Sequence, residues 1–339
     1  MNYMTKTVSV VIPVRNENKY LEGFLQSLLQ QSYPKQQMEW LFVDGMSTDD
    51  TRAILQAHAE DRPDLIRIIE NPEQTVPYAM NRGIRAAAGK YIVRLDAHSE
   101  YAPDYIERCV WHLEHSDADN VGGVAEAAGR NPMGKTIAKV LGSRFGVGNS
   151  QFRTGGQGYV DTVPFGAYRR EIFDRIGYYD ERLTRNQDNE LNFRVRKHGG
   201  KILLAPDIRF TYYGRDTVAG LAKMARQNGY WNVVTMHLMP GSMGVRHFIP
   251  LVFVVSLTLL PLLGFLHPLF HRLLLAELVL YFALAFAFAW RLKDNMREFA
   301  LLVFLFPLFH ISYGLGSLHG ILDTFITKKA LRTCGKENA

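Results

Sequence analysis

Three long apolar stretches near the C-terminus limit what this chain can fold into more than any other feature. They cover residues 248–266, 273–290 and 299–322 and contain very few charged side chains. Each is close to the roughly 20 apolar residues that a helix needs to cross a bilayer. Three buried core helices are the alternative, but this length with so few charges favours a membrane. Because only helices and closed barrels satisfy their backbone in lipid, we expect two to three membrane helices within residues 245–325.

The charges around these stretches leave the membrane topology open. The chain has a formal net charge of +6, and residues 241–339 contain nine Lys and Arg against five Asp and Glu. Basic residues beside apolar helices suit an anionic membrane surface and not nucleic acid. With the first domain in the cytoplasm, three full spans would put the basic tail, residues 326–339, outside, against the positive-inside tendency. Pro307, Gly314 and Gly316 therefore predict that the third stretch is re-entrant.

Before residue 240 the sequence alternates short β-forming runs with helical patterns. The predicted strands are residues 8–13, 40–43, 65–69 and 91–95, and an amphipathic segment follows each of the first three. This alternation is typical of a doubly wound α/β fold with a mostly parallel sheet. Residues 216–236 mix apolar, basic and aromatic positions, which indicates a helix at the membrane interface. We therefore expect an α/β domain over residues 1–236 that ends in this helix, then the membrane region and the basic tail.

Several familiar motifs are missing from the sequence. The two cysteines, Cys109 and Cys334, are far apart, which argues against a disulfide framework or a zinc site and suits a reducing compartment. The N-terminus has no secretory signal pattern, so the first domain is expected to stay in the cytoplasm. The first strand is followed by neither a Gly-x-Gly-x-x-Gly motif nor a P-loop lysine. A bound phosphate would therefore need a metal ion.

Asp96 and His98 follow the buried strand of residues 91–95. In open α/β sheets, ligands bind outside the carboxyl ends of the strands, so both side chains are expected to face that crevice. A carboxylate and an imidazole could hold one divalent ion, Mn²⁺ or Mg²⁺, if a substrate supplied the remaining ligands. A capping Asp and a surface His are the alternative.

Four segments carry a resemblance to a known family: residues 8–17, residues 43–51, the triplet Asp96-Ala97-His98, and residues 186–191. In order and spacing they resemble family 2 glycosyltransferases of the GT-A fold. Asp-Gly-Met-Ser-Thr-Asp at residues 44–49 and the Asp-Ala-His triplet are similar to the branch that includes the succinoglycan biosynthesis glucosyltransferase. Members of that branch carry C-terminal membrane helices, which implies the same arrangement here.

The resemblance implies roles for residues at the strand ends. The donor-binding residues it implies are Pro13, Arg15, Glu17, Asp44, Asn81 and Asp96. Asp44 would accept a hydrogen bond from a uracil ring, and an acid at a strand end gains nothing from the core. Helix capping is an equally good account of Glu17, and simple solvation is an equally good account of Asn81.

The resemblance also places the chemistry in residues 186–191. Asp188 would be the general base that takes the proton from the acceptor hydroxyl, with Glu190 as the second choice. Asn186 could cap the helix, and a carboxylate in its first turn is favoured in the charged form; an acid that only stabilises the helix is the alternative. On the acceptor side, Gln227 and Trp231 match a Gln-x-x-Arg-Trp element in which Tyr230 replaces the arginine. This departure favours a single transfer over processive synthesis.

The resulting expectation is an inverting, metal-dependent transferase at the inner (cytoplasmic) membrane. It would move a hexose from a nucleotide diphosphate sugar, UDP-glucose or UDP-galactose, to a polyprenyl-diphosphate-linked saccharide in cell-surface polysaccharide biosynthesis. Transfer to polyprenyl phosphate itself is a rival within the class. A non-catalytic, nucleotide-binding membrane scaffold is the rival from another class.

Overall fold

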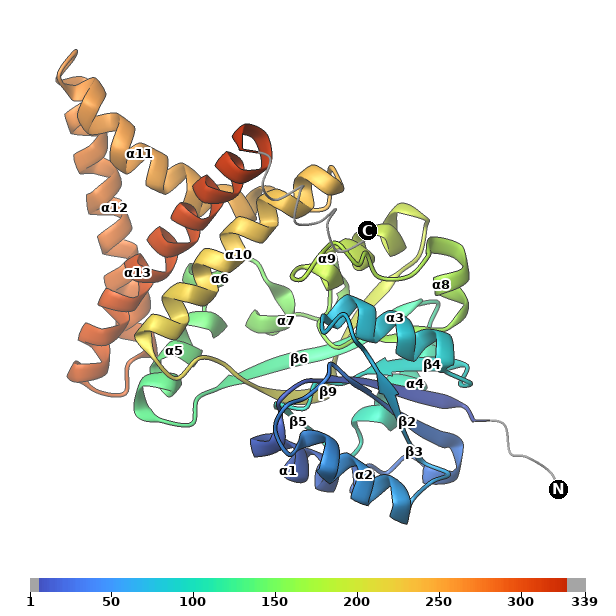
Figure 1. Cartoon of the computed structure of the whole chain (residues 1–339). Helices are drawn as coiled ribbons and strands as arrows, with labels where there is room; N and C mark the ends of the chain where they lie inside the picture. The colour runs from blue at the N-terminus through green and yellow to red at the C-terminus, as the bar shows by residue number, and fades with distance from the viewer. Residues whose placement is uncertain (1–5, 328–339) are drawn as a thin grey trace. The chain divides into compact units, whose positions relative to one another are not determined.

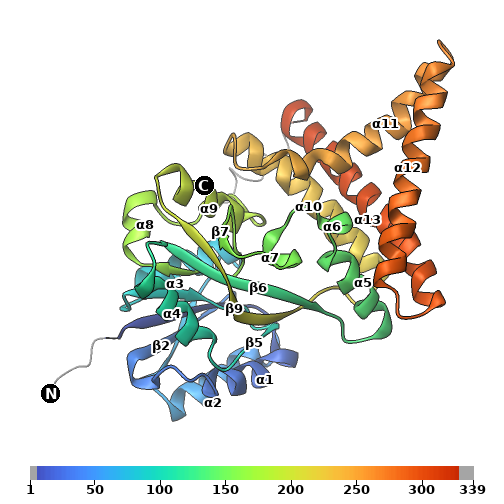
Figure 2. The same cartoon turned by 180° about the vertical axis from the view of Figure 1, so that it is seen from behind.

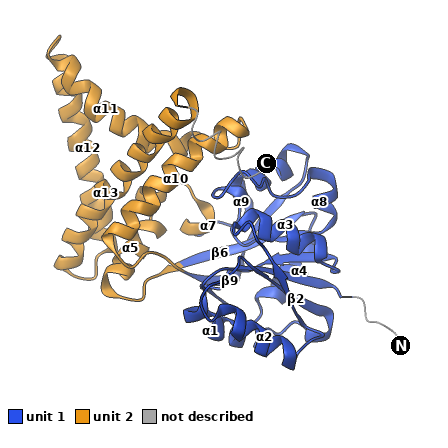
Figure 3. Ribbon diagram, viewed as in Figure 1, with its two compact units in different colours: residues 1–126, 155–212 blue, residues 127–154, 213–339 orange. Residues whose placement is uncertain are grey.

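The protein folds into two compact units (Figure 1 and Figure 3). The computed structural model describes residues 6–327. Unit 1 comprises residues 1–126 and 155–212, and unit 2 comprises residues 127–154 and 213–339. This division differs from the expected boundary at residue 236, because residues 127–154 and 213–236 group with the apolar helices. The basic tail lies almost entirely outside the described residues.

Unit 1 is built on the parallel strands that the sequence predicts. β1 (Val8–Val14) lies between β2 (Met38–Asp44) and β4 (Tyr91–Arg94), and β3 (Ile66–Glu70) pairs with β2, all in parallel. All seven residues of β2 are buried, as expected for a strand covered on both faces. The connecting helices are α1 (Asn18–Leu29), α2 (Thr51–Asp61) and α3 (Val76–Ala86).

Beyond β4 the sheet becomes antiparallel, so the whole sheet is mixed. Within the described residues it has nine strands in the order β3-β2-β1-β4-β8-β6-β9-β5, with β7 beside β9. The added strands are β5 (Ser99–Tyr101), β6 (Asn120–Ala128), β7 (Gly158–Tyr159), β8 (Ala167–Arg169) and β9 (Ile202–Tyr213). The remaining helices of unit 1 are η1 (Lys35–Gln37), α4 (Tyr105–His115), α8 (Glu171–Ile176) and α9 (Gln187–Lys197). The ends of β1, β2 and β4 share one edge of the sheet because these strands are parallel.

Unit 2 contains the apolar helices and two segments that pack against them. Its elements are α5 (Pro132–Gly142), α6 (Arg144–Val147), α7 (Gln151–Thr154), α10 (Val218–Leu238), η2 (Val245–Phe248), α11 (Ile249–Gly264), α12 (Leu269–Leu292), α13 (Met296–Ile321) and η3 (Leu322–Ile326). Residues 245–264, 269–292 and 296–326 are long and apolar enough to cross a membrane. The segment of residues 127–154 contains α5, α6 and α7.

Glycines of α13 lie at close helix contacts and do not interrupt the helix, so the irregular backbone expected in this stretch is not found. α13 is continuous through Pro307. A Cβ on Gly316 would overlap the backbone of Arg226 in α10, and one on Gly229 would overlap the backbone of Tyr313. α10 and α13 therefore touch backbone to backbone, and they lie side by side in both views (Figure 1 and Figure 2). Small residues permit this close approach between helices.

Candidate active site

The loops after β1 and β2 are joined by hydrogen bonds between backbone and side chains. The amide of Asn16 donates to Ser47 Oγ at 3.0 Å, and the amide of Thr48 donates to Asn16 Oδ1 at 2.8 Å. The amide of Glu17 donates to Thr51 Oγ1 at 2.8 Å. Asn16 has a φ of 55°, a left-handed conformation that Asn adopts more readily than most residues. The two loops therefore form one ordered structure at the carboxyl ends of β1 and β2.

Asp44 is the last residue of β2, next to these two loops, and is fully buried. Its Oδ1 accepts from the amide of Ser47 at 3.0 Å and from Ser47 Oγ at 2.6 Å. Its Oδ2 is buried without a hydrogen-bond partner and lies 3.9 Å from Arg52 Nη1. A buried carboxylate oxygen without a hydrogen bond is costly. It suits a site where a ligand supplies the missing donor.

Arg94, at the end of β4, binds two of the predicted site acids. Its Nε donates to Asp96 Oδ1 at 3.1 Å, its Nη2 donates to Asp96 Oδ2 at 3.3 Å, and its Nη1 donates to Asp188. The Arg94 side chain is only 5% exposed. Burial lowers the pKa of Arg94, but Asp188 and Asp96 raise it well above its ordinary value. The guanidinium thus stays charged and holds the two carboxylates on either side of it.

Asp188 occupies the first turn of α9, as the sequence predicts, but its surroundings differ from the expected ones. Asn186 holds the N-cap position in a left-handed conformation, and its side chain makes no capping hydrogen bond. Burial raises the pKa of Asp188, and Arg94 opposes this shift without cancelling it. Its side chain keeps 27% exposure, so the carboxylate can still meet a substrate. A raised pKa brings a carboxylate closer to the range of a general base.

Asn192 fixes the helix that carries Asp188. Its fully buried amide donates to Thr162 Oγ1 at 2.8 Å and to the Val163 carbonyl at 3.1 Å, and its Oδ1 accepts from Asn120 Nδ2 at 2.8 Å. Thr162 also donates to Asn189 Oδ1 at 3.1 Å. These contacts tie α9 to the loop before β8 and to β6.

Glu190, the second candidate base, is held in a different network. Arg194 donates to its two carboxylate oxygens at 2.5 and 2.8 Å, and the Glu190 side chain is 1% exposed. Arg194 also donates to the carbonyl of Ile176, the last residue of α8, and to that of Tyr178 beyond it. This geometry favours a structural task for Glu190 and leaves Asp188 as the more accessible acid.

His98 lies beside Glu17, with 3.4 Å between His98 Nδ1 and Glu17 Oε1. Within residues 6–327 no three His, Cys, Asp or Glu side chains are arranged to hold a metal ion by themselves. A carboxylate and an imidazole are donors that Mn²⁺ accepts, and a diphosphate could complete the shell. The Asp96 side chain is 15% exposed and His98 is 40% exposed, so both remain open to a ligand. The donor set fits an ion that arrives with its substrate.

The other predicted donor residues take different positions. Pro13 lies in β1 and is half-buried, and Arg15 is exposed beside Gly45, where a Cβ would lie 3.3 Å from the Arg15 side chain. Asn81 is buried in α3: its amide donates to the Tyr179 carbonyl at 2.9 Å and to Glu181 at 2.8 Å, and it accepts from the Tyr179 amide at 2.9 Å. These bonds give Asn81 a structural role; its contact with a base stays a prediction.

The predicted acceptor residues belong to unit 2. Gln227 and Trp231 are half-buried residues of α10, and Tyr230 OH donates to Asp323 Oδ2 at 3.3 Å. The residue that replaces the family's arginine therefore ties α10 to η3. The roles of Gln227 and Trp231 toward an acceptor stay predictions.

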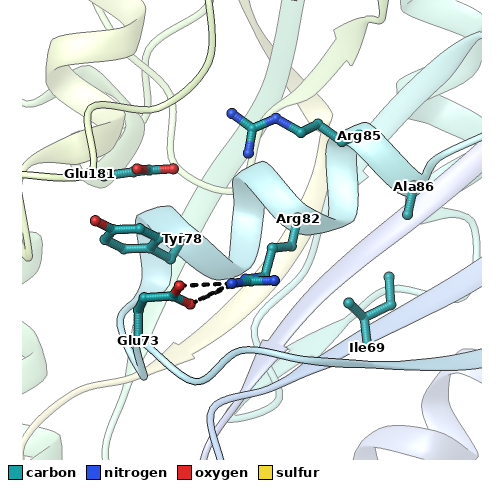
Figure 4. Close-up of a pocket in the computed structure, with 7 residues that line it drawn as sticks. All are labelled: Ile69, Glu73, Tyr78, Arg82, Arg85, Ala86 and Glu181. Atoms are coloured by element: carbon teal, nitrogen blue, oxygen red, sulfur yellow. Dashed lines mark hydrogen bonds and ion pairs between the residues drawn. The ribbon is translucent and has the colours of Figure 1, made fainter. Parts of the chain in front are cut away.

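A pocket of about 580 Å³ lies beside α3 (Figure 4). Arg82, Arg85, Tyr78, Glu73 and Glu181 contribute to its lining. Both carboxylate oxygens of Glu73 already accept from Arg82, at 2.7 and 2.8 Å. None of the predicted site residues lines it.

Sequence reasoning missed Arg94. An arginine in the last position of a fully buried strand needs buried carboxylate partners. That signal predicts a pair, but sequence alone does not say that one partner is two residues away and the other lies in α9. Tyr101 was also missed; its hydroxyl accepts from the Asp96 amide at 2.8 Å and fixes the turn that presents Asp96.

Comparison with known proteins gives consistent relatives. Residues 9–177, about half of the chain, match the model of Glycosyl transferase family 2. The Succinoglycan biosynthesis protein ExoA of Rhizobium meliloti is 32% identical over 62% of this chain and 65% of its own length. A Methanococcus voltae protein, dolichyl N-acetyl-alpha-D-glucosaminyl phosphate 3-beta-D-2,3-diacetamido-2,3-dideoxy-beta-D-glucuronosyltransferase, is 29% identical over 67% of this chain and 76% of its length.

A solved structure shares the fold. The mannosyltransferase PcManGT from Pyrobaculum calidifontis, in complex with GDP-Man and Mn²⁺, has a TM-score of 0.60 at 18% identity and covers 90% of this chain and 86% of its own. The fold, the family match and the relatives agree. The chain therefore belongs to glycosyltransferase family 2, and its first unit is a glycosyltransferase domain of the GT-A fold.

Proposed function

We propose that the protein transfers a hexose, with inversion, from a nucleotide diphosphate sugar to a polyprenyl-diphosphate-linked saccharide in cell-surface polysaccharide biosynthesis. One observation carries this proposal: the guanidinium of Arg94 is bound to Asp96 and Asp188 at once. The expected donor-side acid and the expected base are therefore neighbours of a single cation. A sugar bound next to this cluster would have its leaving group toward Asp96 and its nucleophile toward Asp188.

On the donor side, Asp44 receives the base of the nucleotide. Its free Oδ2 can accept one ring N–H, and both uracil and guanine present such a donor. Glu17, Arg15 and Pro13 would line the ribose and phosphate. Asp96 and His98 would hold a divalent cation, Mn²⁺ or Mg²⁺, whose charge stabilises the departing diphosphate. The Mn²⁺ in the complex of PcManGT supports this assignment.

On the acceptor side, Asp188 takes the proton. An acceptor hydroxyl oxygen attacks the anomeric carbon while the bond from that carbon to the diphosphate oxygen breaks. The electron pair leaves with the diphosphate, and the hydroxyl proton moves to Asp188. Since attack comes from the face opposite the leaving group, the configuration inverts. Arg94 keeps Asp188 oriented and limits the rise of its pKa.

The acceptor is proposed to be lipid-linked. The apolar helices of unit 2 support membrane association, and the name of the Methanococcus voltae relative specifies a dolichyl-linked amino sugar as acceptor. Transfer to polyprenyl phosphate is the rival acceptor reaction, and a nucleotide-binding scaffold without turnover is the rival function. The inner membrane, with the catalytic unit in the cytoplasm, is the proposed location.

The test is a donor screen on the full-length protein in detergent. UDP-glucose, UDP-galactose and GDP-mannose would each be added with and without Mn²⁺, and the thermal midpoint of unfolding measured, since a donor stabilises the folded state by mass action. The stabilising donor, radiolabelled, would then be offered polyprenyl-diphosphate disaccharide and polyprenyl phosphate separately. Label in the first lipid supports the proposal. Label only in the second supports the rival acceptor, and binding without turnover supports the scaffold.

A further inference from the structure

The three apolar helices differ in how much of each is covered by protein. In α11 and α12, 11% of the most apolar stretch is buried within the protein, whereas in α13 the share is 44%. α13 packs against α10, α11, α12 and α5. The outer face of α10 carries the exposed side chains of Lys223 and Arg226. Protein therefore covers a larger share of α13 than of α11 or α12.

The spacing of polar residues in α11 and α12 suits two full crossings. Nineteen residues separate His247 from His267, and eighteen separate Arg272 from Arg291. At a rise of 1.5 Å these are about 29 and 27 Å, close to the roughly 30 Å of a hydrocarbon core. Inside this hairpin, Ser256 Oγ donates to Glu277 Oε1 at 2.6 Å. The acid that the sequence places in an apolar helix thus faces α11.

The first end of this hairpin is fixed by the segment of residues 127–154. Arg246 Nη1, just before α11, donates to the carbonyl of Asn149 at 2.9 Å. Asn149 lies between α6 and α7, in a segment that leaves and re-enters unit 1 along the chain. A segment with both ends in the soluble unit stays on the side of that unit. The start of α11 is therefore at the near surface of the membrane.

The start of α13 is fixed by the same segment. Lys139 Nζ of α5 lies 2.7 Å from Glu298 Oε2 and 2.8 Å from Asp294 Oδ2. Glu298 is in the first turn of α13, and Asp294 is in the turn after α12. These charged groups place the α12–α13 turn at the near surface too.

Gly314, further along α13, also lies close to the near surface of the membrane. A Cβ on Gly314 would overlap the carbonyl oxygen of Pro250, which belongs to the first turn of α11. Gly314 comes sixteen residues after Glu298, about 24 Å along a helix. Since Pro250 is four residues from Arg246, Gly314 and Glu298 are both near the surface where the hairpin begins and ends. A crossing helix could not keep two points so far apart at one level.

We propose that α11 and α12 are the only described helices that cross the membrane and that α13 lies along its near surface with α10. The chain after residue 327 then starts on the side of the catalytic unit. This inference rests on the membrane association proposed above. It also satisfies the positive-inside tendency: the far turn, residues 265–272, has the single charge of Arg272, whereas Arg291, Lys293 and Arg297 lie at the near side.

The chain offers its own reporter for a test. Cys109 is fully buried, and the other cysteine, Cys334, lies in the tail. A membrane-impermeant maleimide would be applied to sealed inside-out and right-side-out vesicles that contain the full-length protein. In a Cys334→Ser background, Lys135→Cys on α5 would report the near side, and Leu266→Cys, where the native residue is 80% exposed, would report the far turn. Labelling in detergent gives the total for each site.

We expect Cys334 and Lys135→Cys to react in the same vesicle orientation and Leu266→Cys in the opposite one, each at least ten times faster than in the other orientation. Reaction of Cys334 together with Leu266→Cys would mean that α13 crosses, and it would overturn the proposal. Reaction of Leu266→Cys together with Lys135→Cys, or from neither side, would exclude the two crossings. If Cys334 is unreactive in detergent, a cysteine added after Ala339 takes its place. Labelling does not depend on turnover, so failure of the proposed transfer would leave this result intact.

Discussion

The guanidinium of Arg94 donates to the carboxylate of Asp188, which lies 94 positions later in the chain. Nη2 and Nε of the same group donate to Asp96. A buried cation between two acids keeps both in place, and removal of any member leaves a charge without its partner. The pair thus links the end of β4 to the start of α9.

Asp188→Asn tests the proposed base. The amide keeps the size of the side chain and loses its basicity, so transfer should fall by a factor on the order of 10² to 10⁴ while donor affinity survives. Initial rates with labelled donor, and thermal stabilisation by the same donor, measure the two quantities. Glu190→Gln is the matched variant: it should weaken the contact with Arg194 and lower stability more than rate. Transfer near the parent rate in Asp188→Asn would place the base elsewhere.

The pH dependence should carry the signature of Asp188. Burial raises its pKa above the ordinary value of 3.8, so the folded state holds this proton to a higher pH than the unfolded state does. The stabilising effect of this proton is complete below the ordinary pKa and is lost as the pH rises through the raised pKa. As the pH rises from the ordinary pKa to the raised pKa of Asp188, the thermal midpoint of the parent should therefore fall relative to that of Asp188→Asn. A constant difference at every pH would contradict the raised pKa.

Asp44→Asn should weaken nucleotide binding. The side-chain oxygen of the new asparagine would still accept from the two donors of Ser47. Its NH₂ group would then face the position expected for the ring N–H of the base, and two donors repel each other. We expect donor affinity to fall by about tenfold or more, as for the loss of one hydrogen bond to a charged group. Ser47→Ala is the control, because it removes one of the two donors to Asp44 and leaves the free oxygen. Unchanged stabilisation of Asp44→Asn by every donor tested would exclude the assignment.

Asn81→Ala should act on stability and not on donor recognition. The change removes three hydrogen bonds that join α3 to residues 179–181, at a cost of about 1 to 3 kcal/mol. Glu181→Gln keeps an oxygen that accepts from Asn81 and should be nearly neutral. The thermal midpoint and the KM for donor separate the two roles. A normal midpoint with a raised KM would support direct contact between Asn81 and the donor.

A chain that ends at Met239 should not stay soluble. The truncation removes α13, against which the apolar faces of α5 and α10 pack, including Ile137, Val140, Leu221 and Met224. Exposed patches of this kind promote aggregation. Size-exclusion chromatography without detergent measures the outcome. A monodisperse, nucleotide-binding fragment would contradict this prediction, because it would show that α5 and α10 can expose their apolar faces to water.

Local signals in the sequence predicted one half of the catalytic unit. The apolar runs of β1, β2 and β4, and the acids at their ends, are short-range patterns, and the structure confirms the parallel strands. Of the antiparallel strands after β4, β5, β7 and β8 have two or three residues each and β6 contains two adjacent glycines, so periodicity could not locate them. β9 is longer, but its pairing with β5 and β7 depends on distant segments. The partnership of Arg94 with Asp188 depends on how distant segments meet, which no spacing reveals.

The helices of unit 2 show a second limit of sequence reasoning. Gly314 and Gly316 read as sites of irregular backbone because glycine is flexible, but here glycine supplies close approach to Pro250 and Arg226. Which of these two properties applies depends on the neighbouring helix. The same limit applies to α5: its apolar face packs against α13, and the sequence of α5 alone does not identify that partner.

The hydrogen bonds between the loops after β1 and β2 have a thermodynamic consequence. Asn16, Glu17, Ser47 and Thr51 already hold one another in the protein without a ligand. The conformational entropy of these loops is lost when the chain folds, so a nucleotide that arrives does not have to order them. Binding of the base should then resemble the docking of rigid bodies, with a heat capacity change no larger than the apolar surface of the base accounts for.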